Sequence, residues 1–446
     1  MPSQGYLQAD WRREAIRTNL WVVPATEAVA VLVLFVGTYA VDRAAYHGDL
    51  HLPSWVLSGT ADSARQILTA VAAAIITVVG IVFSITIVAL TLASTQFGPR
   101  MLRNFIRDGG TQVTLGTFVA TFFYTILTLV SVGSGSTGDF VPHLSVTVAL
   151  VLTLADLAVL IYFLNHVASM IQLPQVIAGI ARDLAREIDI AGGTDTSFGV
   201  GGARGPSRAE LLVRIAESGA VIRTPSSGYL QVIRHDTLLK IASSADAVIH
   251  LPYRPGHFLV RGQVLASVWP AEAAEYVERN LQRGHVTGPY RTLTQDISFG
   301  FDQIVEIALR ALSPAVNDTF TAMTCIDWLG DCLCRISKTW HPEPVRRDDS
   351  GMIRVIAYQA HFDRLVARAF EKIRQAADGM PAVMIRQLEA VTKIVEQTPD
   401  PERRRILRDQ ADMIQRANLR TVPEMADRAD VTARYDAVAA MLDGDP

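Results

Sequence analysis

The sequence predicts an α-helical membrane protein with four transmembrane helices, followed by a cytosolic α+β region that holds a small β-barrel-like unit and a helical domain. Two observations carry this prediction. Four long apolar runs lie before residue 172, and the rest of the 446-residue chain has the charge and alternation of a soluble protein. Because about 20 apolar residues cross the hydrocarbon of a bilayer, each run can form a span. The predicted spans are residues 20–41, 66–95, 112–132 and 143–171.

Basic residues predict the orientation of these spans. One side of the predicted bundle is rich in arginine, and the loops on the other side hold only Arg43 and Arg65. The basic side carries Arg12, Arg13, Arg17, Arg100, Arg103, Arg107, Arg182 and Arg186. Since cytoplasmic segments carry the excess of Lys and Arg, both termini are expected in the cytoplasm and the spans in a bacterial inner membrane. No cleavable signal peptide is expected at the N-terminus.

Composition divides the chain into four parts. Residues 1–190 form the predicted transmembrane domain, and the Gly- and Ser-rich stretch 191–208 predicts a flexible linker. Short β-branched runs separated by Pro-Gly and Ser-Gly turns predict a small cytosolic β domain at 209–290, similar to a barrel-sandwich. Residues 291–446 have a mostly helical pattern and form the predicted cytosolic helical domain, with one short strand expected at 352–358.

Hydroxyl side chains recur along two of the spans. In the second span Thr77, Ser84 and Thr91 are seven residues apart, so they share one face of a helix. Five threonines of the third span step by three or four residues and also share a face: Thr114, Thr117, Thr121, Thr125 and Thr128. One interpretation is tight helix packing, because hydroxyl and small residues let helices approach and bond to one another. The other is that a hydroxyl stripe lines a hydrated path.

Acidic residues mark candidate positions on such a path. Glu27 lies in the first span and Asp156 in the fourth, and no Lys or Arg lies in the core of any span. A charge in hydrocarbon is costly, so it usually faces water, an ion or a partner. Asp139 precedes the fourth span at the predicted external mouth, and the neighbouring loop adds negative potential through Asp42, Asp49 and Asp62. Three simpler alternatives stay open: Glu27 at the cytoplasmic interface, Asp156 bonded to a threonine of the third span, and Asp139 solvated in a loop.

The C-terminal half contains two clusters of reactive side chains. Six acids could hold a cation at a subunit interface, although helix capping and solvated faces are the simpler account: Asp296, Asp302, Glu306, Asp318, Asp327 and Asp331. Asp318 or Asn317 is expected to cap a helix that begins after Pro314. The three cysteines, Cys325, Cys332 and Cys334, lie in one segment with no second pair, which favours buried reduced thiols over a disulfide or zinc site.

Two segments, "FSITIVALTLASTQFGPRMLRNFIRDGGTQVTLGTFVATFFYTIL" and "DISFGFDQIVEIALRALSPAVNDTFTAMTCIDWLGDCL", resemble a bacterial family of multi-pass membrane proteins catalogued as a domain of unknown function. The resemblance extends from about residue 15 to about residue 420. It implies four spans followed by a cytosolic region, and it supplies no catalytic residues. Thr319 stands after "SPAVND" where the family typically has proline.

Other features narrow the functional classes. A formal charge of −3 gives no support to a nucleic-acid partner. The chain has no GxSxG, HExxH or GxxxxGK[ST] motif, so neither enzymatic activity nor a cofactor is predicted.

The favoured hypothesis is a homo-oligomeric ion channel that conducts cations, calcium among them, with cytosolic domains that assemble or gate the pore. Its expected partners are membrane lipid, inorganic cations and further copies of the chain, and its metal ligands are not identified by the sequence. The candidate path residues are Thr77, Ser84, Thr91, Thr117, Thr121, Thr125, Asp139, Asp156 and Glu27. The alternative is a membrane-anchored sensor or scaffold that conducts nothing.

Overall fold

A computed structural model describes residues 22–51, 53–97, 108–135, 138–193, 204–340 and 343–444, without the side chains of residues 93–97, 134–139 and 193. Contacts divide the chain into two compact units, Met1–Gln172 and Leu173–Pro446. Most of the predicted linker at 191–208 lies outside the described residues. So do six arginines that were used to predict orientation: Arg12, Arg13, Arg17, Arg100, Arg103 and Arg107.

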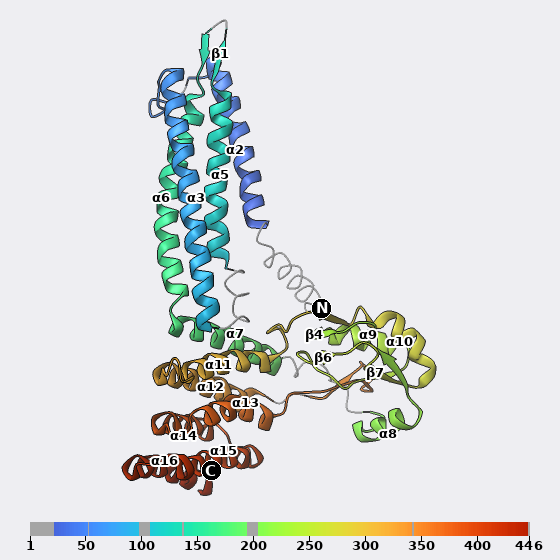
Figure 1. Ribbon diagram of the computed structural model, residues 1–446. Coiled ribbons are helices and arrows are strands. Elements are labelled where there is room, and N and C mark those ends of the chain that lie inside the picture. The colour runs from blue at the N-terminus through green and yellow to red at the C-terminus, as the bar shows by residue number, and fades with distance from the viewer. Residues whose placement is uncertain are drawn as a thin grey trace. The chain divides into compact units, whose positions relative to one another are not determined.

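The first unit contains four long apolar helices, which confirm the four predicted spans (Figure 1). They are α2 (Val22–Tyr46), α3 (Ala61–Phe97), α5 (Gly109–Ser131) and α6 (His143–Met170). Helix α5 packs against the other three. In its most apolar 18-residue stretch 44% of the residues are buried, against 6% in α2. The short hairpin of β1 (Gly133–Gly135) and β2 (Gly138–Phe140) connects α5 to α6.

The second unit begins with α7 (Leu173–Gly193), which packs against α11 (Ile297–Ala311) and α12 (Thr319–Thr339). The contacts place the boundary between the two units after Gln172. Amphipathic α7 follows the fourth span directly, but its buried side chains Ile177, Leu184 and Ile188 belong to the C-terminal region. Four further helices of this region are α13 (Phe362–Ala376), α14 (Pro381–Glu396), α15 (Pro401–Thr421) and α16 (Met425–Asp443).

The described strands of the second unit form two sheets, so the barrel-like arrangement is not confirmed. The five-stranded sheet has the order β3 (Ala220–Arg223), β7 (Val264–Trp269), β5 (Val248–Leu251), β10 (Ile353–Ala357) and β9 (Val345–Arg347). The three-stranded sheet has the order β6 (Phe258–Leu259), β4 (Gly228–Ile233) and β8 (His285–Gly288). The strand expected at 352–358 is confirmed as β10, which pairs parallel to β5. The β domain therefore includes a segment from beyond residue 290.

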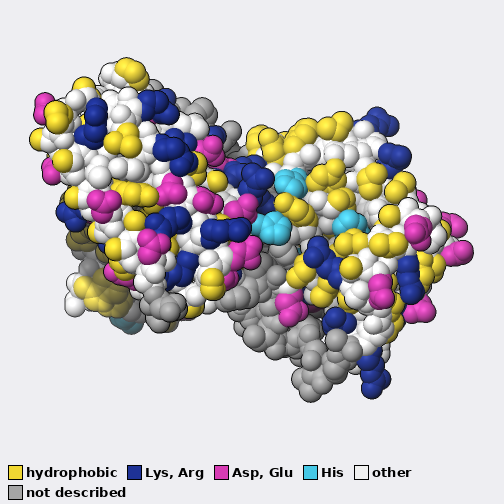
Figure 2. All heavy atoms as spheres, turned by 90° about the horizontal axis from the view of Figure 1, so that it is seen from below, with side chains coloured by type: hydrophobic (Ala, Val, Ile, Leu, Met, Phe, Trp, Pro, Cys, Tyr) yellow, Lys and Arg dark blue, Asp and Glu magenta, His cyan; other side chains and the backbone are white. Residues whose placement is uncertain are grey.

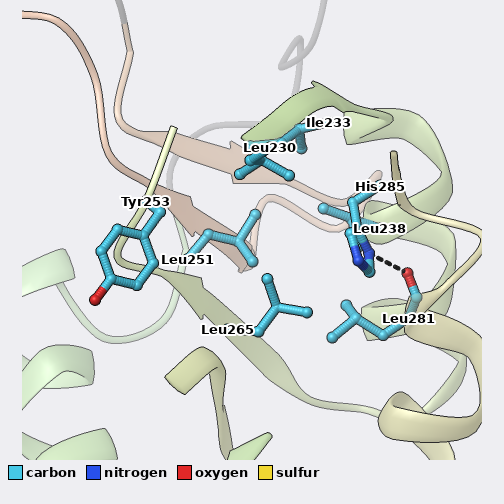
Figure 3. Close-up of a pocket in the computed structure, with 8 residues that line it drawn as sticks. All are labelled: Leu230, Ile233, Leu238, Leu251, Tyr253, Leu265, Leu281 and His285. Atoms are coloured by element: carbon cyan, nitrogen blue, oxygen red, sulfur yellow. Dashed lines mark hydrogen bonds between the residues drawn. The ribbon is translucent and has the colours of Figure 1, made fainter. Parts of the chain in front are cut away.

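Three helices accompany these sheets: α8 (Arg208–Ser218), α9 (His235–Ser244) and α10 (Ala274–Leu281). The apolar interior of the β domain is closely packed. A cavity of only about 10 Å³ lies within it (Figure 3). It is lined by Leu230, Ile233, Leu238, Leu251, Tyr253, Leu265, Leu281 and His285. The Nδ1 atom of His285 lies 2.9 Å from the carbonyl oxygen of Leu281, so the polar ring is tied to the backbone. This interior has no room for a small molecule.

Local chemistry in the helical domain agrees with the sequence. Asp318 caps α12: its carboxylate accepts bonds from the N–H of Thr321 at 3.0 Å and from the hydroxyl of Thr321 at 2.6 Å. The cysteines are free thiols, with Cys325 and Cys332 buried and Cys334 partly buried. Burial raises the pKa of Cys332 to about 12 and that of Cys334 to about 11. Such thiols are protonated and inert at neutral pH.

Candidate functional site

Four threonines of the third span face the interior of the four-helix unit. Thr114, Thr121, Thr125 and Thr128 are at most 1% exposed. Three of these hydroxyls donate to a carbonyl one turn earlier at 2.8 Å, those of Thr114, Thr125 and Thr128. A hydroxyl bonded in this way keeps acceptor capacity for a second partner. Helix α5 thus carries a polar face through the middle of an apolar bundle.

Asp156 meets this face at the centre of its own helix. It lies 13 residues from the start of α6 and 14 from its end, or about 20 Å from each. The residue is 4% exposed, and the hydroxyl of Thr121 donates to its Oδ1 at 3.1 Å. Its Oδ2 is buried without a hydrogen-bond partner among the described residues. Asp156 therefore does bond a threonine of the third span, and one of its oxygens has capacity to spare.

Glu27 approaches the same helix about one and a half turns away from Thr121. A Cβ atom added at Gly116 of α5 would overlap the Oε2 of Glu27 and would lie 3.0 Å from the Cα of Pro24. The absence of a side chain at Gly116 therefore admits the carboxyl group of Glu27. The Oε2 atom is buried and, like Oδ2 of Asp156, has no partner among the described residues.

Polar contacts continue from this centre toward the end that carries the β1–β2 hairpin. The hydroxyls of Thr38 and Tyr124 lie 2.8 Å apart and are buried. Nearby, Asp42 accepts bonds from the N–H groups of Leu144 and Ser145, at 2.7 and 2.9 Å, and from the Ser145 hydroxyl at 2.7 Å. Asp42 thus satisfies the first turn of α6. It lies in α2 and is 3% exposed, so the expectation that it sits in a loop and adds potential at the mouth is wrong.

A half-open pocket of about 500 Å³ lies at this end of the unit. It is lined by Asp42, Ala45, Tyr46, Gly59, Thr60, Ala61, Val141 and His143. Asp139 belongs to β2, where its backbone pairs with Ser134, and its side chain is outside the described part of the structure.

At the opposite end, Asp108 accepts a bond from the backbone N–H of Thr111 at 2.7 Å and so caps α5. The same carboxylate oxygen lies 2.8 Å from Nε2 of His166 on α6. An aspartate–histidine pair thus links α5 and α6 at the end of the unit from which the chain continues to the C-terminal region. Between this pair and Glu27 lie the buried side chains of Gln112 and Thr114.

The hydroxyls of the second span point the other way. Thr77, Ser84 and Thr91 are exposed on α3, and each donates to the carbonyl four residues earlier at 2.8 to 2.9 Å. Thr117 of α5 is partly exposed and donates to Val113 at 2.9 Å. The candidate residues therefore fall into two sets. Thr121, Thr125, Asp156 and Glu27 gather in the interior, whereas the α3 hydroxyls lie on the outside of the unit.

The interior set combines carboxyl and hydroxyl groups. Carboxyl and hydroxyl groups can each accept and pass on a proton or share a small cation. Among the described residues no group of three or more His, Cys, Asp or Glu side chains could hold a metal ion.

Comparison with known proteins identifies the family. Residues 17–393 match the family model described as predicted membrane protein (DUF2254). The chain belongs to this family.

Two relatives of this DUF2254 protein are the uncharacterized protein Rv1290c of Mycobacterium tuberculosis (strain ATCC 25618 / H37Rv) and the uncharacterized protein Mb1321c of Mycobacterium bovis (strain ATCC BAA-935 / AF2122/97). Each is 32% identical over 382 residues, which cover 84% of this chain and 72% of the relative. No solved structure matches the chain.

Several members of the polar face in this DUF2254 chain escaped the sequence reasoning. Thr38, Tyr124 and Gly116 carry no signal of their own in an apolar run, because threonine, tyrosine and glycine are ordinary in membrane helices. Asp108 and His166 lie 58 residues apart, and their pairing follows from the antiparallel packing of α5 and α6. Tyr124 lies three residues after Thr121, so its position on the same helical face could have indicated it.

Proposed function

We propose that this protein is a homo-oligomeric membrane protein that conducts small monovalent cations, the proton included, along the polar face of α5 inside each four-helix unit. The observation that carries the proposal is Asp156. This acid lies about 20 Å from either end of α6, and one of its buried oxygens has no described partner. A buried carboxylate in hydrocarbon costs several kcal/mol unless it serves a path or a partner. Glu27 of α2 is only partly buried, but its Oε2 is likewise buried without a described partner.

This path is not a pore on the symmetry axis between subunits, which the hydroxyl stripes of α3 and α5 would line together. The interior set is enclosed by the helices of one chain, so the proposal gives each subunit its own path. Calcium is a poorer fit than a monovalent ion, because one hydroxyl and one carboxylate at a time satisfy a proton or a partly hydrated small cation but not Ca²⁺. The arginine distribution supports cytoplasmic termini, and the C-terminal region would then assemble or regulate the path from that side.

The α3 stripe is assigned to contact between subunits. Thr77, Ser84 and Thr91 repeat every seven residues on an exposed face, and a Cβ added at Gly80 on that face would meet nothing within 4 Å. Small residues with satisfied hydroxyls let a second helix approach closely in a membrane. Cyclic symmetry would bring copies of this face together.

Light scattering of the detergent-solubilised protein, corrected for detergent, is therefore expected to give an oligomer. Gly80→Leu should shift the equilibrium toward the monomer, because the leucine side chain would block the close approach of a second helix. Ile81→Leu, which changes an exposed apolar neighbour, should leave the mass unchanged. A wild-type protein that is monomeric would remove the oligomer from the proposal.

The conduction proposal is tested by ion flux into proteoliposomes, with a pH-sensitive dye inside for H⁺ and labelled Rb⁺ in a parallel series. Asp156→Asn keeps the shape and the bond from Thr121 but removes the charge. We expect at least about a tenfold loss of flux, because a charge in the span is worth about 2.5 kcal/mol or more and each 1.4 kcal/mol is tenfold in rate.

Asp139→Asn serves as the comparison at the predicted mouth, where a smaller effect is expected because water screens the charge. Absence of flux in the wild type would favour the alternative, a membrane-anchored sensor or scaffold. Equal flux in the wild type and Asp156→Asn would remove Asp156 from the path.

A further inference from the structure

Three arginines and two aspartates of the C-terminal region meet at the beginning of α11. Asp296 caps this helix, accepting the backbone N–H of Phe299 at 3.3 Å, and Asp302 lies further along it. Arg254 follows β5, Arg291 follows β8, and Arg368 belongs to α13. The group, here called the arginine cluster, therefore joins the β domain to the helical domain. The acids of this segment bind arginine rather than a cation, as the following distances show.

The two aspartates are already engaged. Arg291 donates to Asp296 through Nε at 2.8 Å and to Asp302 through Nη1 at 2.6 Å. Arg254 lies 3.4 Å from Asp296, and Arg368 donates to both oxygens of Asp302 at 2.6 Å. Three guanidinium groups thus share two carboxylates. An excess of one positive charge remains in a place where Asp296 is 1% exposed and the side chains of Arg254 and Arg291 are 16% and 19% exposed.

The cluster also has N–H groups that, among the described residues, are free to donate hydrogen bonds. The Nε of Arg254 is buried and has no hydrogen-bond partner among the described residues. The described bonds of Arg368 are made by Nη1, so its other N–H groups are available. Its side chain is 36% exposed, which opens the cluster to solvent on that side. The cluster thus combines a charge excess with N–H groups that no described residue accepts.

His257 adds a further donor beside the arginines. Its Nδ1 accepts the backbone N–H of Arg254 at 3.3 Å, so a neutral ring carries its proton on Nε2. Burial, together with Arg254, Arg291 and Arg368, lowers the pKa of His257, which keeps the ring neutral at pH 7. The three arginines are thus close enough to act on one imidazole.

An aromatic edge borders the cluster. The ring of Tyr358 lies 5.9 Å from that of His257 and 5.9 Å from that of His361, and Tyr358 is 43% exposed. Figure 2 shows exposed histidines next to a group of Lys and Arg side chains on one face of the molecule. A ligand with an anionic group and a planar ring could contact both the arginines and an aromatic ring here.

We propose that the arginine cluster, with His257 beside it, binds a phosphate-bearing small molecule. The planar guanidinium fork matches phosphate oxygens two at a time, and several arginines from different elements are the usual way to hold such a group. Phosphate also neutralises the excess charge, and it uses the donors that the two aspartates leave. Because the cluster joins β and helical elements, the ligand would stabilise their packing. The proposal is independent of ion conduction.

The test is ligand binding by the full-length protein in detergent, followed by thermal unfolding and by calorimetric titration. The probes are inorganic pyrophosphate and ATP at up to millimolar concentration, with sodium chloride of equal ionic strength as the reference. We expect pyrophosphate, ATP or both to raise the melting temperature. Arg368→Gln, which leaves Asp302 bonded to Arg291, should weaken the affinity at least about tenfold, a change of about 1.4 kcal/mol.

Arg386→Gln is the matched control. Its side chain is 34% exposed and pairs with Asp327 at 3.5 Å and Glu389 at 3.4 Å, away from the cluster. This variant should bind like the wild type. Two results would overturn the proposal: a response to the probes no larger than that to chloride, or equal affinities in the wild type and Arg368→Gln.

Discussion

Replacement of Asp296 with alanine is expected to destabilise the C-terminal region by about 3–5 kcal/mol, the usual cost of removing one partner from a buried ion pair. Asp296 is 1% exposed and contacts both Arg254 and Arg291. Without it, Arg254 loses its carboxylate partner, Arg291 keeps only Asp302, and α11 loses its cap. The measurement is the melting temperature of the full-length protein in detergent, with the transition of the C-terminal region followed by near-ultraviolet circular dichroism.

Asp327→Ala provides the comparison for this prediction. Asp327 is 43% exposed and pairs with Arg386 at 3.5 Å. An exposed pair of this kind contributes about 1 kcal/mol or less, so the melting temperature should hardly change. If the two variants had similar melting temperatures, the charges around Asp296 would be in contact with water. That result would contradict the burial seen in the structure.

The second large effect is expected from Gly116→Val in the third span. A side chain here overlaps the carboxyl group of Glu27 and presses on the backbone of α2 at Pro24. Overpacking of this kind costs about 1–3 kcal/mol. On the proposed path it also displaces the carboxyl group of Glu27, so cation flux in proteoliposomes should fall by at least about tenfold.

Thr117→Val is the neighbouring control for Gly116→Val. The change is nearly isosteric, and Thr117 is partly exposed with its hydroxyl bonded to Val113 in its own helix. Flux should therefore stay near the wild-type value. A Gly116→Val protein that conducts normally would show that ions do not pass between α2 and α5.

The arrangement of the membrane unit could largely be predicted from the sequence. Each span is a continuous local signal, and the four helices begin and end within a few residues of the predicted bounds, with α3 and α2 extended at their polar ends. The pattern also showed that the threonines of α5 share a face. It could not show that this face points inward while that of α3 points outward, because periodicity defines a face and packing decides what the face contacts.

Contacts between distant segments were beyond the sequence. Strand β10 was expected, but its pairing with β5 joins residues about a hundred positions apart and has no local signature. The acids around α11 were visible, whereas their arginine partners lie up to 66 residues away. Arginines on a surface and arginines around a buried carboxylate have the same appearance in a sequence. The arginine cluster therefore emerged only from the fold.

The most direct test of the central claim is the current carried by the full-length protein in a planar bilayer between unequal concentrations of KCl, and then under a pH gradient. The account predicts a current whose reversal potential moves toward the equilibrium potential of K⁺ or of H⁺, and which Asp156→Asn reduces. A folded, reconstituted protein that carries no current, or one whose reversal potential follows chloride, would contradict it.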